Sequence, residues 1–399
     1  MQIDHFAEAL DASQPLSIDA NSLLAHHLLI TGATGSGKST SLLRLVECLR
    51  DKKQATIIFD PTGEYQTAGH VVRYKLGENA SIDVSQLTAM EITKLLGDHE
   101  GEFVDRFESA ITALQIQKQV VKQPGIYNKI NRTQVSYRND KSQLKFCGHD
   151  YDTSQLINQL IQEFIVPYAD HQADYNLLGQ TLDYQVIQRH WSKILAMQEQ
   201  LSSPNLAGLF KHEQVNAQQP QTDMSYVLKL FATRKSQATL VIDVSMLMKH
   251  GAQSRLVLSI LLRELLTIRT TSDARFPLTI FLDEAHRFLP NNNDTLSDSG
   301  LFKLIREGRK YGLYVVLSTQ SPLDLPVKLS GQFGSLLIHQ LNNQAEVTSL
   351  LNNQAEQVAT YQKLSPGQGL LKVNGTTVVH PVCVAIPNAL HSTDSPKFS

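Results

Sequence analysis

Short apolar runs recur along this chain, and each ends in polar or acidic residues. Most of the runs lack alternation of apolar and polar positions, which is typical of strands buried on both faces of a parallel sheet. The runs are residues 27–31, 56–60, 240–244, 278–283, 314–319 and 335–340. Helical patterns at 254–269 and 300–310 lie between them. This alternation predicts an α/β fold with a doubly wound sheet.

The middle of the chain follows a different pattern. Residues 89–119 and 153–169 have helical spacing of apolar positions, and residues 214–221 are polar and rich in glutamine. We therefore expect a split core at 1–85 and 228–388, with a mainly helical insertion at 86–227. A polar tail at 389–399 is expected to be loose.

Composition narrows the class of protein only slightly. The 399 residues carry a net charge of −2 and three cysteines, which are far apart and form no metal or redox motif. The N-terminus lacks the order of a signal peptide, and no apolar run approaches the roughly 18 residues of a membrane span. We expect a cytoplasmic protein without a membrane segment.

The most informative motif follows the first apolar run. Residues 32–39 read G-A-T-G-S-G-K-S, the phosphate-loop pattern G-x-x-x-x-G-K-[ST] between a strand and a helix. Its glycines let successive N–H groups point at phosphate oxygens, Lys38 reaches the β- and γ-phosphates, and Ser39 can ligate Mg²⁺. The residues expected to hold ATP here are Gly32, Ala33, Thr34, Gly35, Ser36, Gly37, Lys38, Ser39 and Thr40.

A second acidic site fits the first. The apolar run 278–282 ends in Asp283 and Glu284. In phosphate-loop ATPases an aspartate at this place holds the Mg²⁺ water shell, and a following glutamate can polarise the attacking water. The sequence D-E-A-H at 283–286 also spells a helicase box, but Lys38 and Asp283 are 245 residues apart, much further than in the helicases named for that box.

The complete motif set has a better match. The phosphate loop is followed by D-P-T-G-E-Y at 60–65, D-E-A-H at 283–286, R-E-G-R-K-Y-G at 306–312 and S-T-Q at 318–320. This set resembles the HerA-like ATPases of the HerA/FtsK superfamily, which are ring-forming DNA translocases. The resemblance implies a RecA-like P-loop NTPase core, a homo-hexamer, and double-stranded DNA as a partner.

The resemblance also implies roles for individual residues. Gln320 would sense the γ-phosphate, and Arg309 would reach into the site of the next subunit, with Arg306 as the alternative. Asp60 and Glu64 are expected near the nucleotide, where they order water or couple nucleotide state to the insertion. Ser39 and Asp283 are the expected Mg²⁺ residues.

A basic segment in the insertion is a candidate DNA contact. Residues 118–145 have a local net charge of +6, with two interleaved tyrosines, and such segments contact phosphates and stack on bases. A solvated polar face explains the same pattern equally well. The candidate DNA contacts are Lys118, Lys122, Lys129, Arg132 and Arg138.

The sequence departs from the family at its start. HerA proteins usually begin with a β-barrel that helps dock a nuclease, whereas only 31 residues precede Gly32 here. Short forms of this kind resemble those paired with effector proteins in anti-phage systems. We predict an ATP-driven hexameric DNA translocase that works with a nuclease or other effector, and the alternative is an ATP-gated ring scaffold that regulates a partner without processive translocation.

Overall fold

The computed structural model divides the chain into two compact units. They are Met1–Leu76 together with Ser225–Ser399, and Gly77–Met224. The expected boundaries were 1–85 with 228–388, and 86–227. The residues that the structure describes are 1–10, 15–63, 65, 71–98, 101–146, 150–209, 221–245, 251–289, 296, 299–343, 346–347, 350, 361 and 364–388. The tail at 389–399 and Glu64 lie outside them.

The first unit is built on one sheet of eleven strands. Their order is β2-β1-β15-β14-β13-β3-β12-β11-β4-β10-β5, and the seven from β13 to β5 are parallel. The strands are β1 (Gln2–Ala9), β2 (Pro15–Asp19), β3 (Leu28–Thr31), β4 (Thr56–Asp60), β5 (Val71–Lys75), β10 (Thr239–Asp243), β11 (Leu278–Leu282), β12 (Leu313–Thr319), β13 (Ser335–His339), β14 (Gln368–Lys372) and β15 (Val379–Val384). The α/β fold class is therefore confirmed.

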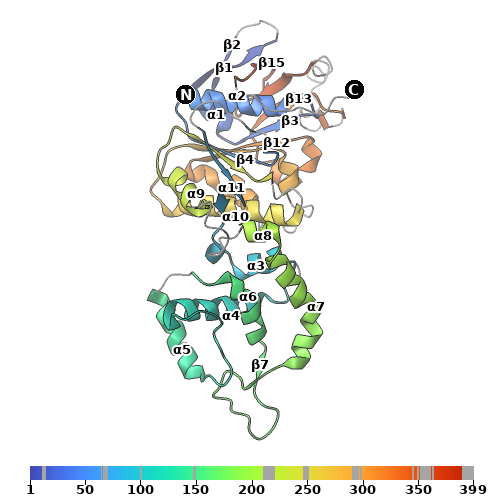
Figure 1. Ribbon diagram of the computed structural model, residues 1–399. Coiled ribbons are helices and arrows are strands. Elements are labelled where there is room, and N and C mark those ends of the chain that lie inside the picture. Colours follow the sequence, from blue (N-terminus) through green and yellow to red (C-terminus); the bar gives the residue numbers. More distant parts are fainter. Residues whose placement is uncertain are drawn as a thin grey trace. The chain divides into compact units, whose positions relative to one another are not determined.

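Helices cover the parallel part of the sheet. Figure 1 shows α2 on one side of it and α10 and α11 on the other. The helices of this unit are α1 (Ala20–Leu24), α2 (Lys38–Asp51), α9 (Met224–Thr233), α10 (Gly251–Thr271), α11 (Gly300–Glu307) and α12 (Val327–Ser330), with 3₁₀ turns η6 (Ala285–Phe288), η8 (Gly308–Tyr311) and η9 (Pro322–Asp324). Gly300 lets α11 approach α10 closely, because a Cβ there would lie 1.9 Å from the Ser259 carbonyl oxygen.

The core forms because the strand residues alternate between the two covered faces. Leu28 and Ile30 of β3 pack in one cluster with Leu42 and Val46 of α2. All four residues of β3 are fully buried, as the continuous apolar run predicts. Because β3 is fully buried, its carboxyl end is held firmly in the core, and the phosphate loop begins from that end.

Five strands of the sheet were not predicted. β14, β15, β1 and β2 pair antiparallel and extend the sheet beyond β13, and β5 forms the opposite edge. β1, β2, β5 and β15 mix polar with apolar residues and have exposed or partly exposed positions, and β14 has only three consecutive buried residues. The continuous apolar pattern that identified the central strands is therefore missing from them.

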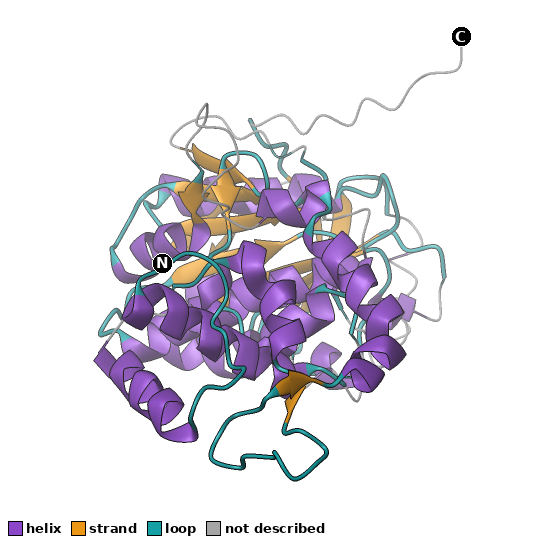
Figure 2. Cartoon of the chain, turned by 60° about the horizontal axis from the view of Figure 1, so that its bottom comes forward, coloured by secondary structure: helices purple, strands orange, loops and turns teal. Residues whose placement is uncertain are grey.

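The second unit is mainly helical; Figure 2 draws the helices of both units in purple. Its elements are β6 (Ala80–Ser81), η1 (Val84–Gln86), α3 (Ala89–Leu95), α4 (Val104–Gln115), the π-helix η2 (Ile116–Val121), α5 (Gln134–Gln143), η3 (Leu144–Phe146), η4 (Thr153–Gln155), α6 (Leu156–Gln162), β7 (Ile165–Val166), β8 (Thr181–Leu182), α7 (Tyr184–Leu201), α8 (Pro204–Leu209) and β9 (Thr222–Asp223). The expected helix at 89–119 is interrupted, because Gly97 and Gly101 have φ of +95° and +78°.

Candidate functional site

Four parallel strands end at the same edge of the sheet and bring the predicted site residues together. β3 leads into the phosphate loop, β4 into Asp60 and Tyr65, β11 into Asp283 and β12 into Gln320. β12 lies between β3 and β11, so Gln320 follows the strand that separates the phosphate loop from the acidic pair. Ligands of open α/β sheets bind at this carboxyl edge.

The phosphate loop has the backbone that its glycines predict. Gly35 and Gly37 have φ of +80° and +112°, which favour glycine, and a Cβ on Gly32 would lie 2.6 Å from the Cβ of His339. Helix α2 begins at Lys38, and its N-cap residue Gly37 offers no side-chain hydrogen bond. The first N–H groups of this helix are therefore left for an anion.

Two observations show that the loop fits a phosphate group. The hydroxyl of Ser36 is buried and has no hydrogen-bond partner among the described residues. The ammonium of Lys38 is largely buried and donates to the carbonyl oxygen of Ala33 at 3.2 Å. Burial lowers the pKa of Lys38, and the carboxylates of Glu284 and Asp283 oppose that shift. An anion bound in the loop would supply further stabilisation of the charged form.

The Asp283 carboxylate accepts hydrogen bonds from four different places in the chain. One oxygen, Oδ2, accepts from Ser39 Oγ at 3.1 Å and from the hydroxyl of Tyr65. The other, Oδ1, accepts from Ser318 Oγ and from the backbone N–H of Glu284 at 2.9 Å. The pairing of a helix-terminal hydroxyl with a buried carboxylate is the donor set that an octahedral Mg²⁺ site with retained waters uses, so these residues fit Mg²⁺.

Glu284 and Gln320 are in direct contact. The Nε2 of Gln320 lies 3.2 and 3.1 Å from the two carboxylate oxygens of Glu284, and Nδ1 of His286 lies 3.3 Å from one of them. Glu284 has φ of +49°, a strained conformation for a residue with a side chain, and such strain is found at functional sites. The predicted water-activating residue and the predicted sensor thus form one unit.

Asp60 makes its contacts within its own loop. Its carboxylate accepts from the N–H and hydroxyl of Thr62 and from the N–H of Gly63 and Tyr65, over 2.8 to 3.0 Å. The fully buried Asp60 therefore fixes the shape of the turn after β4. Its expected contact with the nucleotide stays a prediction, as does that of Glu64, which lies outside the described residues.

Sequence reasoning missed three residues of this site. Tyr65 and Ser318 both donate a hydrogen bond to Asp283. Tyr65 is the last residue of the D-P-T-G-E-Y motif, and Ser318 is the first residue of the S-T-Q motif. His339 is fully buried behind the phosphate loop, with Nε2 2.8 Å from Ser41 Oγ and Nδ1 2.8 Å from the Gln368 carbonyl oxygen. Burial lowers its pKa to about 4, and no sequence signal marked it.

Arg309 lies near the amino end of β3, whereas the phosphate loop follows the carboxyl end of the same strand. Its guanidinium contacts the ring of His26 and the carbonyl oxygen of Ala25, just before β3 begins. The loop at Gly32 is one strand length away, on the order of 13 Å for four residues. Arg306 stacks over the ring of Phe302 at 5.4 Å. Neither arginine contacts the phosphate loop of its own chain.

The basic segment of the second unit is partly consumed by internal contacts. Lys129 is buried and pairs with Glu163, so it is not available to DNA, contrary to its place among the candidate contacts. Arg132 pairs with Asp140 at 3.1 Å and stacks over the Tyr127 ring at 4.1 Å, and Lys118 pairs with Asp150 at 2.8 Å. These residues stabilise the fold of the unit.

Three exposed cations of the same segment lie on one helix face. Arg138 and Lys141 of α5 and Lys145 of η3 are spaced three and four residues apart, so they project from the same side. Tyr137 and Asp140 lie on the other side, against Lys129 and Tyr127 respectively. All three cations are exposed and have no acidic partner among the residues described for this unit. We call them the α5 basic face; Lys122 is also exposed.

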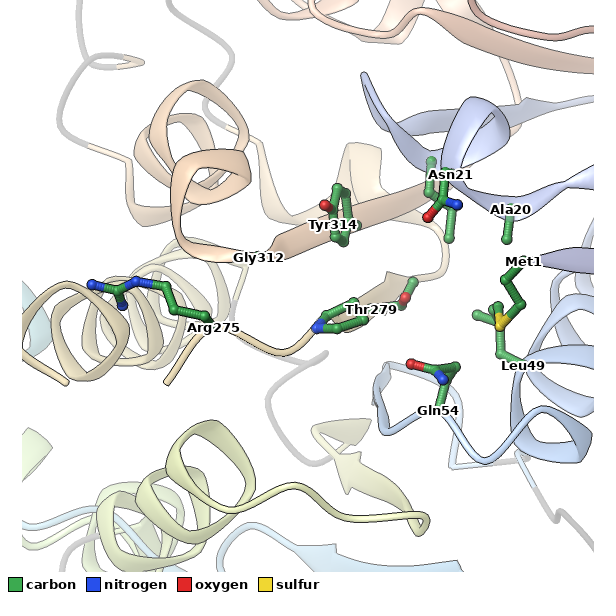
Figure 3. Close-up of a pocket in the computed structure, with 11 residues that line it drawn as sticks. Met1, Ala20, Asn21, Leu49, Gln54, Arg275, Thr279, Gly312 and Tyr314 are labelled. Atoms are coloured by element: carbon green, nitrogen blue, oxygen red, sulfur yellow. The ribbon is translucent and has the colours of Figure 1, made fainter. Parts of the chain in front are cut away.

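A separate cavity lies near the amino ends of the parallel strands. Its volume is about 280 Å³, and Thr279 and Tyr314 line it from near the first residues of β11 and β12 (Figure 3). Arg275 and Gln54 are also among the lining residues. None of its eleven lining residues is a predicted nucleotide contact. Among the described residues, no helix has the length and apolarity to cross a membrane, and no cluster of histidine, cysteine and acidic residues forms a metal site.

Solved structures share this fold. VirB4 of Thermoanaerobacter pseudethanolicus superposes with a TM-score of 0.62 at 13% identity, covering 97% of both chains. The plasmid coupling protein TrwB in complex with ADP and Mg²⁺ superposes with a TM-score of 0.53 at 14% identity, over 96% of this chain and 91% of that one. At these identities the likeness shows the fold alone.

Comparison with sequence relatives identifies the family, which the structural likeness alone does not. The chain is 22% identical over 324 residues to the DNA double-strand break repair helicase HerA of Saccharolobus solfataricus, and 24% identical over 339 residues to a probable HerA of Methanocaldococcus jannaschii. These alignments cover 79% and 80% of this chain but 54% and 63% of the relatives. The family described as the central domain of helicase HerA matches residues 5–265, two thirds of the chain, and the chain belongs to that family.

Proposed function

We propose that this protein is a Mg²⁺-dependent ATPase that forms a homo-hexameric ring and couples ATP hydrolysis to movement along double-stranded DNA. The observation that carries the proposal is the hydrogen bond between Ser39 and Asp283, with the Glu284–Gln320 pair beside it. It joins the phosphate loop to the acidic pair, which 243 residues of sequence separate. Membership of the HerA family supports the proposed ATPase activity, and the contacts within the site support the proposed mechanism.

Each residue of the site has one task in the proposed reaction. Lys38 and the N–H groups of the loop bind the β- and γ-phosphates, and Ser39 and Asp283 hold Mg²⁺, which when bound neutralises phosphate charge. Glu284 accepts a proton from the attacking water. Gln320 bonds Glu284 in this structure. In the proposed reaction its amide exchanges that bond for one to a phosphate oxygen.

Arg309 supports the ring. A finger that lies one strand length from its own phosphate loop has to serve another copy of the chain, and a guanidinium crossing the boundary would neutralise charge on the transferred phosphoryl group. We therefore expect Arg309→Ala alone and Glu284→Gln alone to be nearly inactive, while a mixture of the two regains part of the ATP turnover. In the mixture, some boundaries combine an intact Glu284 with an intact Arg309.

The mixing experiment needs an assembly control and a comparison residue. Sizing of each variant must show the same oligomer as the wild type. Arg306→Ala is expected to keep most of the turnover, because Arg306 contacts Phe302. Suppose instead that Arg306→Ala alone is inactive and regains turnover when mixed with Glu284→Gln, while Arg309→Ala never does. That result would identify Arg306, and not Arg309, as the residue that acts across the subunit boundary.

The α5 basic face is our proposed DNA contact. Removal of one cation that contacts a phosphate reduces the salt slope of binding by about one unit. We expect the triple substitution of Arg138, Lys141 and Lys145 by alanine to flatten the slope by about three units, measured by fluorescence anisotropy on duplex DNA from about 50 to 200 mM salt. Basal ATP turnover should survive, since these residues lie in the second unit.

A charge-matched triple variant of the first unit controls for net charge. It replaces Arg234, Lys235 and Lys328, which are also exposed. Equal slopes in both triple variants would mean that the α5 basic face is a solvated surface.

The second candidate function is an ATP-gated ring scaffold that regulates a partner without processive translocation. The observation in its favour is that three of the five predicted DNA contacts, Lys118, Lys129 and Arg132, are paired with acidic residues. In both versions we propose a cytoplasmic protein that works with a nuclease or other effector in anti-phage defence. That part rests on the resemblance of the motif set alone.

A further inference from the structure

Tyr65 connects the turn after β4 to the acidic pair. Its side chain is 1% exposed, and its hydroxyl donates to Oδ2 of Asp283. The same oxygen accepts from Ser39. A phenylalanine would fill the same space in the core, so packing alone does not require the hydroxyl. The hydroxyl is directed at Asp283, whose carboxylate fits Mg²⁺, and it also interacts with the side chain of Ser39.

The backbone around Tyr65 is fixed independently of Asp283. Asp60 accepts the Tyr65 N–H at 3.0 Å and the Gly63 N–H at 2.8 Å. The carbonyl oxygen of Gly63 accepts from Arg73 at 2.7 Å, and Arg73 in turn pairs with the buried Asp243 at 2.8 Å. The phenol is therefore delivered to Asp283 by a turn that three neighbouring strands, β4, β5 and β10, hold in place.

We propose that Tyr65 is a positioning residue for Asp283, which holds the carboxylate in the orientation that binds Mg²⁺ and so sets the affinity for Mg²⁺·nucleotide. This inference rests on the proposed ATPase site and adds a residue to it. Once Mg²⁺·nucleotide binds, the Ser39 hydroxyl oxygen is expected to contact Mg²⁺, which weakens its hydrogen bond to Asp283. Tyr65 then remains as the side-chain donor on Oδ2, while Ser318 and the N–H of Glu284 hold Oδ1.

The test is the Mg²⁺ dependence of nucleotide binding in Tyr65→Phe. The probe is a fluorescent, non-hydrolysable ATP analogue titrated into the full chain at a series of Mg²⁺ concentrations and in EDTA. Substitution of groups that orient metal ligands lowers metal affinity by about 10- to 100-fold. We expect the Mg²⁺ midpoint to rise about tenfold or more, while affinity for the analogue in EDTA stays near that of the wild type.

Tyr127→Phe is the matched control. Tyr127 is also fully buried and also donates its hydroxyl to an aspartate, Asp140, at 2.6 Å, but it belongs to the second unit. Loss of this hydroxyl should lower the melting temperature without moving the Mg²⁺ midpoint. A double variant, Tyr65→Phe with Asp283→Asn, should show no larger shift than Asp283→Asn alone, because Tyr65 acts through Asp283.

The outcomes separate this inference from the proposed function. If the wild type fails to bind the analogue with or without Mg²⁺, the proposed ATPase site is wrong. If the wild type binds with a clear Mg²⁺ midpoint and Tyr65→Phe has the same midpoint, Tyr65 is not a positioning residue. A lower midpoint in Tyr65→Phe would also overturn the inference, since the hydroxyl would then compete with Mg²⁺ for Asp283.

Discussion

Glu284→Gln is expected to bind ATP and to stall its hydrolysis. Glutamine keeps the shape of the side chain and can still contact Gln320, but it cannot accept a proton from water. Loss of a positioned general base costs about 100-fold or more in turnover. Phosphate release measured at saturating ATP, together with the amount of ATP retained on the protein after rapid gel filtration, gives both quantities.

Lys38→Ala is expected to affect both hydrolysis and nucleotide binding. It removes the cation that faces the phosphates, so hydrolysis should be abolished and nucleotide binding weakened. Glu8→Gln serves as the control, because Glu8 is exposed on β1 and pairs in register with β2 and β15, away from the site. Turnover near the wild-type rate in Glu284→Gln would exclude Glu284 as the base.

Arg269→Met is expected to destabilise the first unit more than any surface change. The guanidinium is fully buried and donates to the carbonyl oxygens of Tyr311 at 3.0 Å, Ala232 at 2.9 Å and Phe276. Its removal leaves three carbonyl groups without this donor, at about 1 kcal/mol or more each. We expect a loss of about 3 kcal/mol or more, seen as a melting temperature lower by roughly 6 °C or more.

Arg275→Met is the control for Arg269. Arg275 is exposed and bonds carbonyl groups of its own turn, those of Ser272 and Ala274. Its substitution should change stability by no more than about 0.5 kcal/mol. Melting followed by circular dichroism and by a dye on the same samples would compare the two variants. Equal melting temperatures for both would mean that Arg269 does not clamp η8, α9 and the start of β11.

The central strands and the site could be predicted because their signals are local. Continuous apolar runs identified β3, β4, β11 and β12, and the residues that follow these strands carry the motifs. Parallel strands bring their carboxyl ends to one edge, so motifs about 240 residues apart in the chain meet there. The structure brings Lys38, Ser39, Asp283, Glu284 and Gln320 together, and their roles in catalysis stay predictions.

What the sequence did not reveal depends on contacts between distant segments. Strand β1 joins the main sheet through its pairing with β15, which begins at Val379, 370 residues after β1 ends at Ala9. The pairing of Lys129 with Glu163 is likewise invisible in a local charge count, which is why a buried lysine was expected at a DNA surface. His339 became part of the site because β13 lies beside β3.

The most direct test of the account is ATP turnover by the wild-type chain in Mg²⁺, with and without long linear duplex DNA. We predict that turnover rises on adding DNA and that Glu284→Gln abolishes both the basal and the stimulated rates. Turnover that is present but identical with and without DNA would contradict DNA translocation and favour the ring scaffold. No Mg²⁺-dependent turnover under either condition would contradict the proposed ATPase itself.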